Sequence, residues 1–208
     1  MSTDSGARYL VELYYKSGFD ATANELSFFM ILALRFLLSP STTSTVNEHT
    51  VRPFCHWFSH QRSRDSLFRP IHFPDVIPRL GSNFRLAEAD FLSLKSPSLG
   101  YHYITTLFFI DTSLNVVQTI EHIYSLLRPG GIWINLGPLL WTGGAQAKVE
   151  LSLEEVLSLS ETMGFIFDTQ DDDPSRKSKT VNCEYTADQG AMMQWIYNAE
   201  FWVARKPK

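Results

Sequence analysis

The longest apolar runs of the chain have the character of buried strands. Residues 101–110 (YHYITTLFFI) are β-branched, aromatic and almost continuously apolar, and residues 132–137 (IWINLG) form a second, shorter run. Runs of this kind are typical of strands in a sheet that is covered on both faces. We therefore predict buried strands at both places, with the strand at 101–110 central in its sheet.

Segments with helical spacing of apolar residues separate the predicted strands. They lie at residues 7–17, 26–38, 113–127 and from Ser152 to Met163. The last of them opens with a capping box, in which Glu155 follows Ser152 by three residues. Further strands are predicted at 19–24, 83–91, 165–169 and 197–206, with a polar loop at 40–50, an irregular stretch at 51–82 and another polar loop at 170–180.

This alternation of strands and helices predicts an α/β fold. Its sheet should be mainly parallel, with helices on both faces and antiparallel pairing only near the last strand. The chain of 208 residues, 44% apolar and 19% charged, has the composition of a globular protein and suits a single domain over residues 1–208.

Charge and cysteine content limit the classes of partner and compartment. The net charge of −4 argues against a general binder of nucleic acid or anionic membranes, since these proteins carry a basic surplus. The two cysteines, Cys55 and Cys183, do not make a disulfide framework and fit a reducing compartment. The apolar run 26–38 contains Arg35 and is too short to span a bilayer, and residues 1–20 show no secretory signal. We expect a cytoplasmic protein.

Acidic residues follow several of the predicted strands, at the sheet edge where α/β proteins bind ligands. Glu25 is suited to accept hydrogen bonds from ribose hydroxyls, or it is a favourable charge at a helix start. Asp90 and Phe91 are suited to pair with the amino group of an adenine and to cover its ring. Alternatively, Asp90 is a solvated acid in a turn and Phe91 is an aromatic residue of the core. Asp111 directly follows the strand at 101–110. Its carboxylate is placed to bind a cationic or amine substrate, or it caps the next helix.

Two other kinds of site find little support in the sequence. Cys55, His56, His60 and His72 lie in one segment, but this segment lacks a second clear pair of metal ligands. No G-x-S-x-G motif of a serine hydrolase is present. We expect no metal centre.

Several motifs together resemble the carnosine N-methyltransferase family in order and spacing, from about residue 6 to the end. They are NELSFFM (24–30), FRPIHFPDV (68–76), GSNF (81–84), ADF (89–91), FFIDT (108–112), RPGGIWINLGPLL (128–140) and FWVARKP (201–207). This resemblance implies a Rossmann-like class I methyltransferase fold that uses S-adenosyl-L-methionine. The reaction it implies is N-methylation of a small amine, imidazole or peptide-like substrate.

The resemblance also assigns roles to individual residues. Glu25 matches the acid that binds the cofactor ribose, and Asp90 and Phe91 match the pair beside adenine. Asp111 matches the acid that holds the substrate and is the best catalytic candidate. Tyr197 matches an aromatic wall of the substrate pocket.

The chain departs from the family pattern at two places in the expected site. The family's first strand and glycine-rich loop are missing except for a remnant at Gly6, which is the remaining candidate of that loop for cofactor binding. Thr142 stands where the family has a histidine that contacts the substrate.

Two classes of function follow from these residues. The first is an N-methyltransferase whose partner is a small-molecule or short-peptide substrate, with neither nucleic acid nor membrane involved. The second is a methyltransferase-like binding protein that has lost cofactor binding, which the missing strand favours. A homodimer is a possible assembly of the chain.

Overall fold

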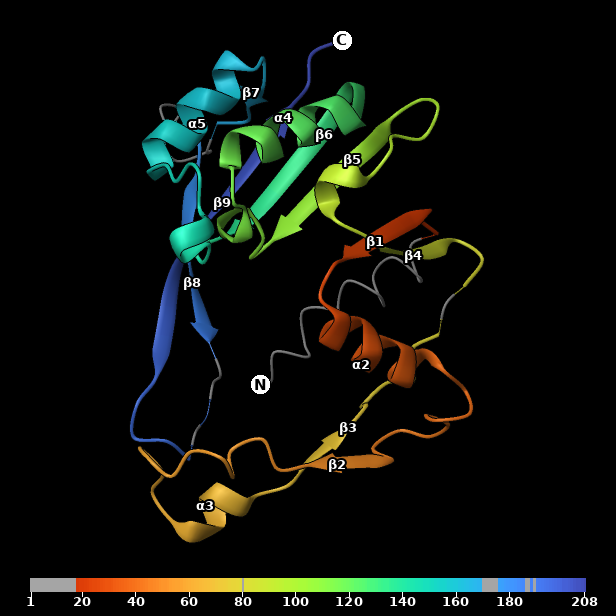
Figure 1. Ribbon diagram of the computed structural model, residues 1–208, viewed down its shortest axis with the longest axis vertical. Coiled ribbons are helices and arrows are strands. Elements are labelled where there is room, and N and C mark those ends of the chain that lie inside the picture. Colours follow the sequence, from red (N-terminus) through yellow and green to blue (C-terminus); the bar gives the residue numbers. More distant parts are fainter. Residues whose placement is uncertain (1–17, 80, 170–175, 186–187, 189) are drawn as a thin grey trace. The chain divides into compact units, whose positions relative to one another are not determined.

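The computed structural model describes residues 18–79, 81–169, 176–185, 188 and 190–208 (Figure 1). The chain divides into two compact units: unit 1 contains Met1–Ser93 and Glu184–Trp195, and unit 2 contains Leu94–Cys183 and Ile196–Lys208. The predicted helix at 7–17 and the candidate residue Gly6 lie outside the described residues.

Unit 1 is built on a parallel pair of strands joined through a helix. Strand β1 (Ala21–Glu25) pairs with β4 (Phe84–Glu88), and helix α2 (Phe28–Leu38) follows β1. The helix ends at Ser39 because the following proline disfavours the helical conformation in the residue before it. These three elements confirm the predicted strands and helix. Parallel pairing brings the carboxyl ends of β1 and β4 to one edge.

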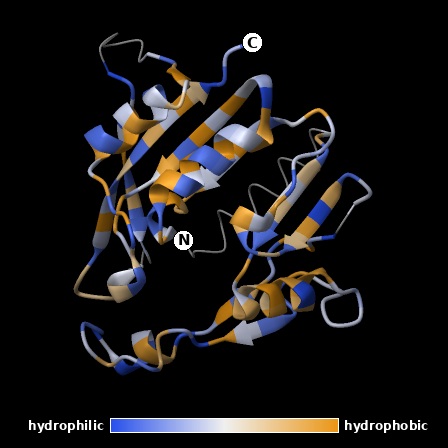
Figure 2. Cartoon of the chain, turned by 45° about the horizontal axis from the view of Figure 1, so that its top comes forward, coloured by the Kyte–Doolittle hydropathy of each residue, from blue (hydrophilic) through white to orange (hydrophobic). Residues whose placement is uncertain are grey.

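Helix α2 is apolar around most of its circumference, with Arg35 as its one charged residue (Figure 2). None of its residues is buried. The guanidinium of Arg35 pairs with the carboxylate of Glu88, the last residue of β4. This ion pair joins the helix to the strand pair.

The rest of unit 1 contains three short elements. Strands β2 (His49–Val51) and β3 (Ile71–Phe73) pair in antiparallel fashion, and helix α3 (Arg64–Phe68) lies between them in the sequence. The predictions of a polar loop at 40–50 and of an irregular stretch at 51–82 are wrong for these elements, since β2 begins in the first segment and ends in the second. Three-residue strands and a five-residue helix are too short to leave a recognisable period in the sequence.

Unit 2 contains a mixed sheet with strand order β5-β6-β9-β7, in which β8 also pairs with β9 (Figure 1). Its strands are β5 (Tyr101–Leu107), β6 (Leu127–Gly137), β7 (Ile166–Phe167), β8 (Lys179–Tyr185) and β9 (Trp195–Arg205), and its helices are α4 (Val116–Leu126) and α5 (Leu153–Thr162). The β5–β6 pair is parallel, whereas β9 is antiparallel to β6 and β7. Antiparallel pairing near the last strand is thereby confirmed, as is the capping box at Ser152.

Two details of the predicted sheet are wrong. Strand β5 stands at the end of the strand order, not at its centre, because no other described strand pairs with its second edge. Strand β8 was missed, since its first two residues fall in the segment predicted as a polar loop. Its sequence, KTVNCEY, carries a charge near each end, and its residues are exposed or half-buried.

The core of unit 2 is centred on Trp133 of β6 and Trp202 of β9, both fully buried. Their ring centroids lie 5.4 Å apart with the planes perpendicular, an arrangement that aromatic pairs prefer. The Trp133 indole donates to Oγ1 of Thr106 over 2.9 Å, and this hydroxyl donates to Oδ1 of Asn135 over 2.8 Å. The neighbouring strands β5 and β6 are thus tied together by side chains as well as by their backbones.

Candidate functional site

Glu25 and Asp90 lie at the same edge of unit 1. Glu25 is the last residue of β1, and Asp90 follows β4 by two residues. The Asn24 side-chain amide donates to the backbone carbonyls of Ala87 and Ala89, over 3.0 and 2.7 Å. This contact fastens the turn that carries Asp90 to the end of β1. The structure therefore brings together the two acids that the sequence suggested for ribose and adenine.

Each of these acids also has a local structural role. Oε1 of Glu25 accepts from the backbone N–H of Ser27 over 2.6 Å, at the start of α2. Oδ1 of Asp90 accepts from the N–H of Leu92 over 2.9 Å and opens the short 3₁₀ helix Phe91–Ser93. A carboxylate has about four acceptor sites, so one local hydrogen bond leaves capacity for a ligand.

Asp111 lies in unit 2, four residues beyond the end of β5. The chain turns at Phe108, whose φ of 48° is in the left-handed region, and Asp111 sits in a 3₁₀ helix at Ile110–Thr112. The residue is only 6% exposed. Oδ2 of its carboxylate accepts from the backbone N–H of Leu140 over 3.0 Å, in the loop that follows β6.

Burial raises the pKa of the Asp111 carboxyl above its ordinary value, and the hydrogen bond from Leu140 partly opposes this rise. Desolvation of this kind increases the affinity of a carboxylate for a cationic or hydrogen-bond-donating partner. A buried acid with a raised pKa at the end of a strand is also a common property of functional sites.

The alternative role of Asp111 as a helix cap is wrong. The N-cap of α4 is Asn115, whose side chain accepts from the N–H of Gln118 over 3.4 Å. Thr112, the next residue, donates its hydroxyl to the Phe109 carbonyl over 2.7 Å. Asp111 is therefore not needed to start α4.

The structure places Thr142 and Tyr197 around the turn that carries Asp111. Thr142 donates its N–H and its hydroxyl to the backbone carbonyl of Asp111, over 3.1 and 3.3 Å. The ring of Tyr197 meets the ring of Phe108 edge-on, with centroids 5.6 Å apart. The three residues predicted to contact substrate thus belong to one part of unit 2.

The close approach of Gly137 to Phe108 shapes this turn. A Cβ atom added at Gly137 would lie 3.0 Å from both N and Cα of Phe108, where only backbone could yield. We expect Gly137→Ala to lower the free energy of unfolding by about 1–3 kcal/mol, the usual cost of overpacking. Chemical denaturation measures this loss, and an unchanged unfolding midpoint would contradict the close contact.

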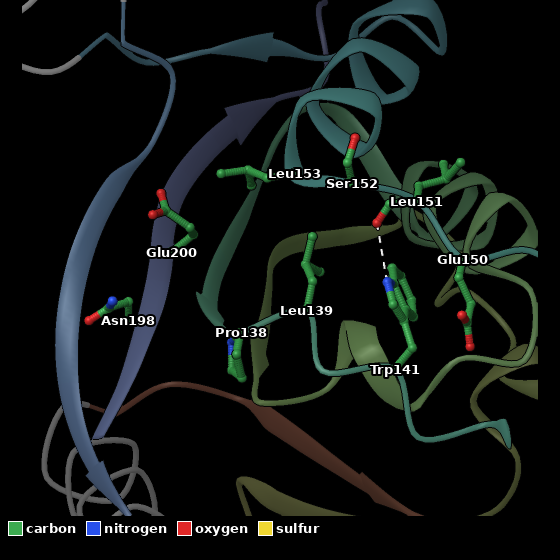
Figure 3. Close-up of a pocket in the computed structure, with 9 residues that line it drawn as sticks. All are labelled: Pro138, Leu139, Trp141, Glu150, Leu151, Ser152, Leu153, Asn198 and Glu200. Carbon is green, nitrogen blue, oxygen red and sulfur yellow. Dashed lines mark hydrogen bonds between the residues drawn. The ribbon is translucent and has the colours of Figure 1, made fainter. Parts of the chain in front are cut away.

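A pocket of about 500 Å³ opens beside the loop that follows β6 (Figure 3). It is lined by Pro138, Leu139, Trp141, Glu150, Leu151, Ser152, Leu153, Asn198 and Glu200. The carboxylate of Glu200 accepts from the hydroxyls of Ser178 and Thr180, over 2.6 Å each. The Trp141 indole donates to the Leu151 carbonyl over 3.2 Å.

The sequence did not single out these pocket residues. An acid inside the apolar strand at 197–206 is the signal that could have identified Glu200. Neither Asp111 nor Tyr197 lines the pocket, although its wall includes the loop that holds the Asp111 carboxylate.

Within the described ranges, no group of three or more His, Cys, Asp or Glu side chains is arranged to hold a metal ion. Across the same part of the chain, no helix combines the length and the apolar character needed to cross a membrane.

Several curated proteins similar in sequence to this chain are named carnosine N-methyltransferase. The family model described as carnosine N-methyltransferase matches residues 5–208. The carnosine N-methyltransferase of Mus musculus is 36% identical over 197 residues, which are 92% of this chain and 47% of that protein. The protein of Schizosaccharomyces pombe is 33% identical over 210 residues, with coverage of 92% and 54%. The chain thus spans about half the length of the curated relatives it matches.

Among solved structures, the N-methyltransferase NodS from Bradyrhizobium japonicum is 17% identical, with a TM-score of 0.39 over 62% of each chain. The family assignment depends instead on the sequence match, which extends over nearly the whole chain and includes both the β1–β4 edge and the Asp111 turn. This chain belongs to the carnosine N-methyltransferase family.

Proposed function

We propose that this chain is an S-adenosylmethionine-dependent N-methyltransferase that acts on a small amine, imidazole or peptide-like acceptor. The observation that carries the proposal is the Asp111 carboxylate, which is buried at the end of β5 with a raised pKa and is not used as a helix cap. The ring contact between Phe108, in the same turn, and Tyr197 of β9 supports a flat or cationic acceptor group.

The β1–β4 edge fits the polar parts of the cofactor. Ribose hydroxyls are donors that need acceptors, and Glu25 and Asp90 supply carboxylates at one edge. Phe91, directly after Asp90, supplies an aromatic side chain of the kind that packs on a base. When bound, S-adenosylmethionine supplies a methyl group on a sulfonium. In this proposal Glu25, Asp90 and Phe91 bind and orient the cofactor and take no part in bond making.

The proposed reaction is a direct displacement. The acceptor nitrogen attacks the methyl carbon in line, so that the new N–C bond forms as the C–S bond breaks. The methylated acceptor then loses a proton to solvent, from the same nitrogen of an amine or from the other ring nitrogen of an imidazole. Asp111 accepts a hydrogen bond from the acceptor and stabilises the positive charge that develops on its nitrogen. Holding the two reactants in line can supply about 7–11 kcal/mol of the rate enhancement.

One assay tests this proposal on the full 208-residue chain. Methyl transfer from radiolabelled S-adenosylmethionine is measured with carnosine, histidine, histamine and a simple primary amine as acceptors, and with a simple thiol and a phenol as controls. We expect transfer to an imidazole or amine acceptor and none to a thiol or phenol. Absence of transfer to every acceptor, together with no cofactor binding by calorimetry, would refute it.

The alternative function is a methyltransferase-like binding protein without methyl transfer. The observation that favours it is the edge of β5, which no other described strand pairs with. A folded chain that neither binds S-adenosylmethionine nor methylates any acceptor would support the alternative.

We expect Glu25→Ala to weaken S-adenosylmethionine binding about tenfold or more. Hydrogen bonds to a charged acceptor contribute about 1.5–3 kcal/mol, and about 1.4 kcal/mol corresponds to a factor of ten. Calorimetric titration measures the dissociation constant. The matched control is Glu88→Ala, which removes an acid in register with Glu25 on β4 but one that pairs with Arg35. Equal losses in both variants would remove Glu25 from the cofactor site.

A further inference from the structure

The pocket beside the loop that follows β6 combines negative charge with an apolar wall. All of its lining residues belong to unit 2. The two charged ones are acids, Glu150 and Glu200, and none of the described residues around the pocket is basic. Figure 3 shows these acids on opposite sides of the pocket, with Leu139 and Trp141 between them. A cavity of about 500 Å³ has the size of a small-molecule site, and this lining favours a cation over an anion.

The carboxylate of Glu200 is oriented but not neutralised. Its Oε2 accepts from the hydroxyl of Ser178 and its Oε1 from that of Thr180, over 2.6 Å each. Both donors are neutral, so they fix the direction of the carboxylate without compensating its charge. Neither Glu200 nor Glu150 forms an ion pair with a described residue. A carboxylate has about four acceptor sites, so Glu200 keeps the capacity to bind a further donor.

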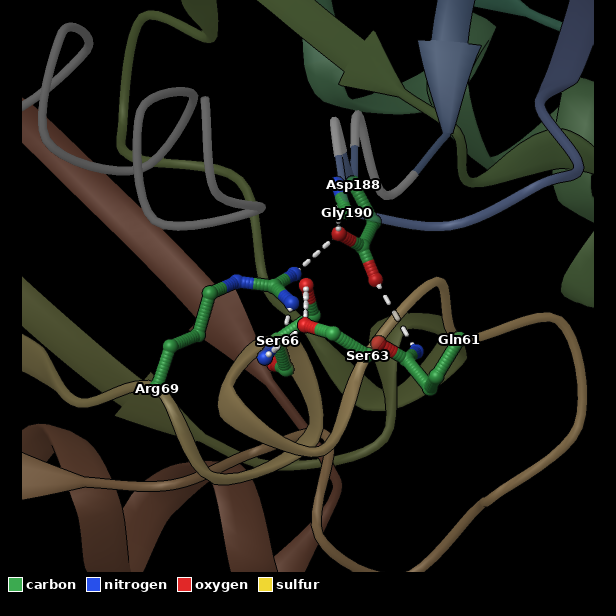
Figure 4. Close-up of polar contacts among 6 residues, drawn as sticks. All are labelled: Gln61, Ser63, Ser66, Arg69, Asp188 and Gly190. Atoms are coloured by element: carbon green, nitrogen blue, oxygen red, sulfur yellow. Dashed lines mark hydrogen bonds and ion pairs between the residues drawn. The ribbon is translucent and has the colours of Figure 1, made fainter.

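The carboxylate of Asp188 in unit 1 shows the opposite arrangement (Figure 4). Its Oδ1 forms an ion pair with the guanidinium of Arg69 and accepts from the N–H of Gly190 over 2.8 Å. Its Oδ2 accepts from the side-chain amide of Gln61 over 3.3 Å. Asp188 thus has a cation of its own within the fold, whereas the half-buried Glu200 turns an uncompensated charge to a pocket.

This pocket is distinct from the place where the sequence predicts the methyl acceptor. Side chains of successive residues in a strand point to opposite faces. Asn198 and Glu200 of β9 both line the pocket, whereas Tyr197 contacts the ring of Phe108. The pocket therefore lies on the face of β9 opposite Tyr197.

We propose that this pocket binds an organic ammonium ion. The ammonium group donates to the carboxylate of Glu200, and the carbon chain of the ligand packs against Leu139 and Leu153. Glu150, on the opposite side, increases the negative potential of the pocket. The site takes no part in the proposed methyl transfer, and its test does not require that the chain has this activity.

The test uses butylammonium as the probe and the indole N–H resonance of Trp141 as the reporter. Trp141 lines the pocket, and its resonance is assigned in a ¹⁵N-labelled chain by comparison with Trp141→Phe. At constant ionic strength, butylammonium should shift this resonance in a saturable way, with a dissociation constant of about 1–10 mM for so small a ligand. The neutral analogue butanol should bind at least tenfold more weakly. Equal binding of both, or no saturable shift with butylammonium, overturns the proposal.

Glu200→Gln keeps the size of the side chain and removes its charge. It should weaken butylammonium binding at least tenfold, since hydrogen bonds to an ionised acceptor are about twice as strong as neutral ones. The matched control is Glu154→Gln, which removes an exposed acid in the first turn of α5 that does not line the pocket. This control should stay within twofold of the wild type. Equal losses in the two variants would show a general charge effect and contradict a site at Glu200.

Asp111→Asn distinguishes this pocket from the proposed acceptor site, which also favours amines. Butylammonium binding reported by Trp141 should be unchanged in this variant, because Asp111 does not line the pocket. A loss in Asp111→Asn with wild-type affinity in Glu200→Gln would assign the probe to the acceptor site and overturn the proposal.

A second variant covers the case in which Glu200→Gln does not fold. Asn198 is exposed and lies two residues before Glu200 on the same face of β9, so Asn198→Lys places an ammonium group beside the carboxylate. This built-in cation should abolish butylammonium binding, whereas the control Asn198→Gln should retain it. A folded Asn198→Lys protein with wild-type affinity for butylammonium contradicts the proposal.

Discussion

Asp111→Asn is expected to lower kcat of methyl transfer about 100-fold while leaving the affinity for S-adenosylmethionine within about twofold. Asparagine keeps the size of the side chain and an oxygen that accepts from the Leu140 N–H. It removes the negative charge that would stabilise the positive charge developing on the acceptor nitrogen. Losses of about 3 kcal/mol are typical when one such electrostatic group is removed.

Steady-state kinetics and calorimetric titration of the cofactor measure the two quantities for the same preparation. The matched control is Thr112→Ala, which changes the next residue in the same 3₁₀ helix, one whose hydroxyl bonds only locally to the Phe109 carbonyl. Wild-type kcat in Asp111→Asn would leave this carboxylate without a role in the reaction.

The stability of Asp111→Asn should change in the opposite direction to its activity. Burial raises the pKa of Asp111 in the folded chain above its unfolded value. The folded state therefore binds this proton more tightly, and the resulting stabilisation is present below the unfolded pKa and is lost as pH rises through the folded pKa. At neutral pH the variant lacks a desolvated charge, so its melting temperature should equal or exceed that of the wild type, whereas at acid pH this advantage should disappear.

The second large effect is expected in the core of unit 2. Trp133→Ala should lower the free energy of unfolding by about 3–5 kcal/mol, the usual cost of replacing a fully buried large aromatic residue. The change removes the contacts of the indole ring with Trp202 and Phe165, and it leaves the Thr106 hydroxyl without the N–H that donates to it.

Chemical denaturation measures this loss, and Trp57→Ala is its control because Trp57 is 51% exposed and lies in unit 1. The control should change the free energy of unfolding by less than about 0.5 kcal/mol. A loss below about 1 kcal/mol in Trp133→Ala would contradict the central place of this residue in the core.

Local sequence signals were sufficient for much of the fold. The capping box at Ser152 and Glu155 predicted the start of α5 because both partners of that interaction lie within one turn. The apolar run at 197–206 predicted β9 because a long buried strand leaves a continuous pattern. Strand β8 has no such pattern, and the position of β5 at the end of the strand order depends on which strands pair with it, which composition does not encode.

The candidate site was predictable in its residues but not in its contacts. Asp111 was recognisable as an acid at the end of an apolar strand and as a match to the family motif. Its burial and its bond to the Leu140 N–H, which lies 29 residues away in sequence, arise only when the loop after β6 folds over it. The same holds for Asp188 and Arg69, separated by 119 residues, whose pairing no local pattern indicates.

The distribution of tryptophans gives the chain a built-in spectroscopic reporter. Of the five tryptophans, Trp133 and Trp202 of unit 2 are shielded completely from water and Trp141 of unit 2 is half-buried, whereas Trp57 and Trp195 of unit 1 are about half exposed. Water around an excited indole shifts its fluorescence to longer wavelength, so the buried pair should emit to the blue of Trp57 and Trp195. Unfolding of unit 2 should therefore move the emission maximum strongly to the red, while unfolding of unit 1 moves it little. Intrinsic fluorescence can thus follow the loss of the core around Asp111 without any label.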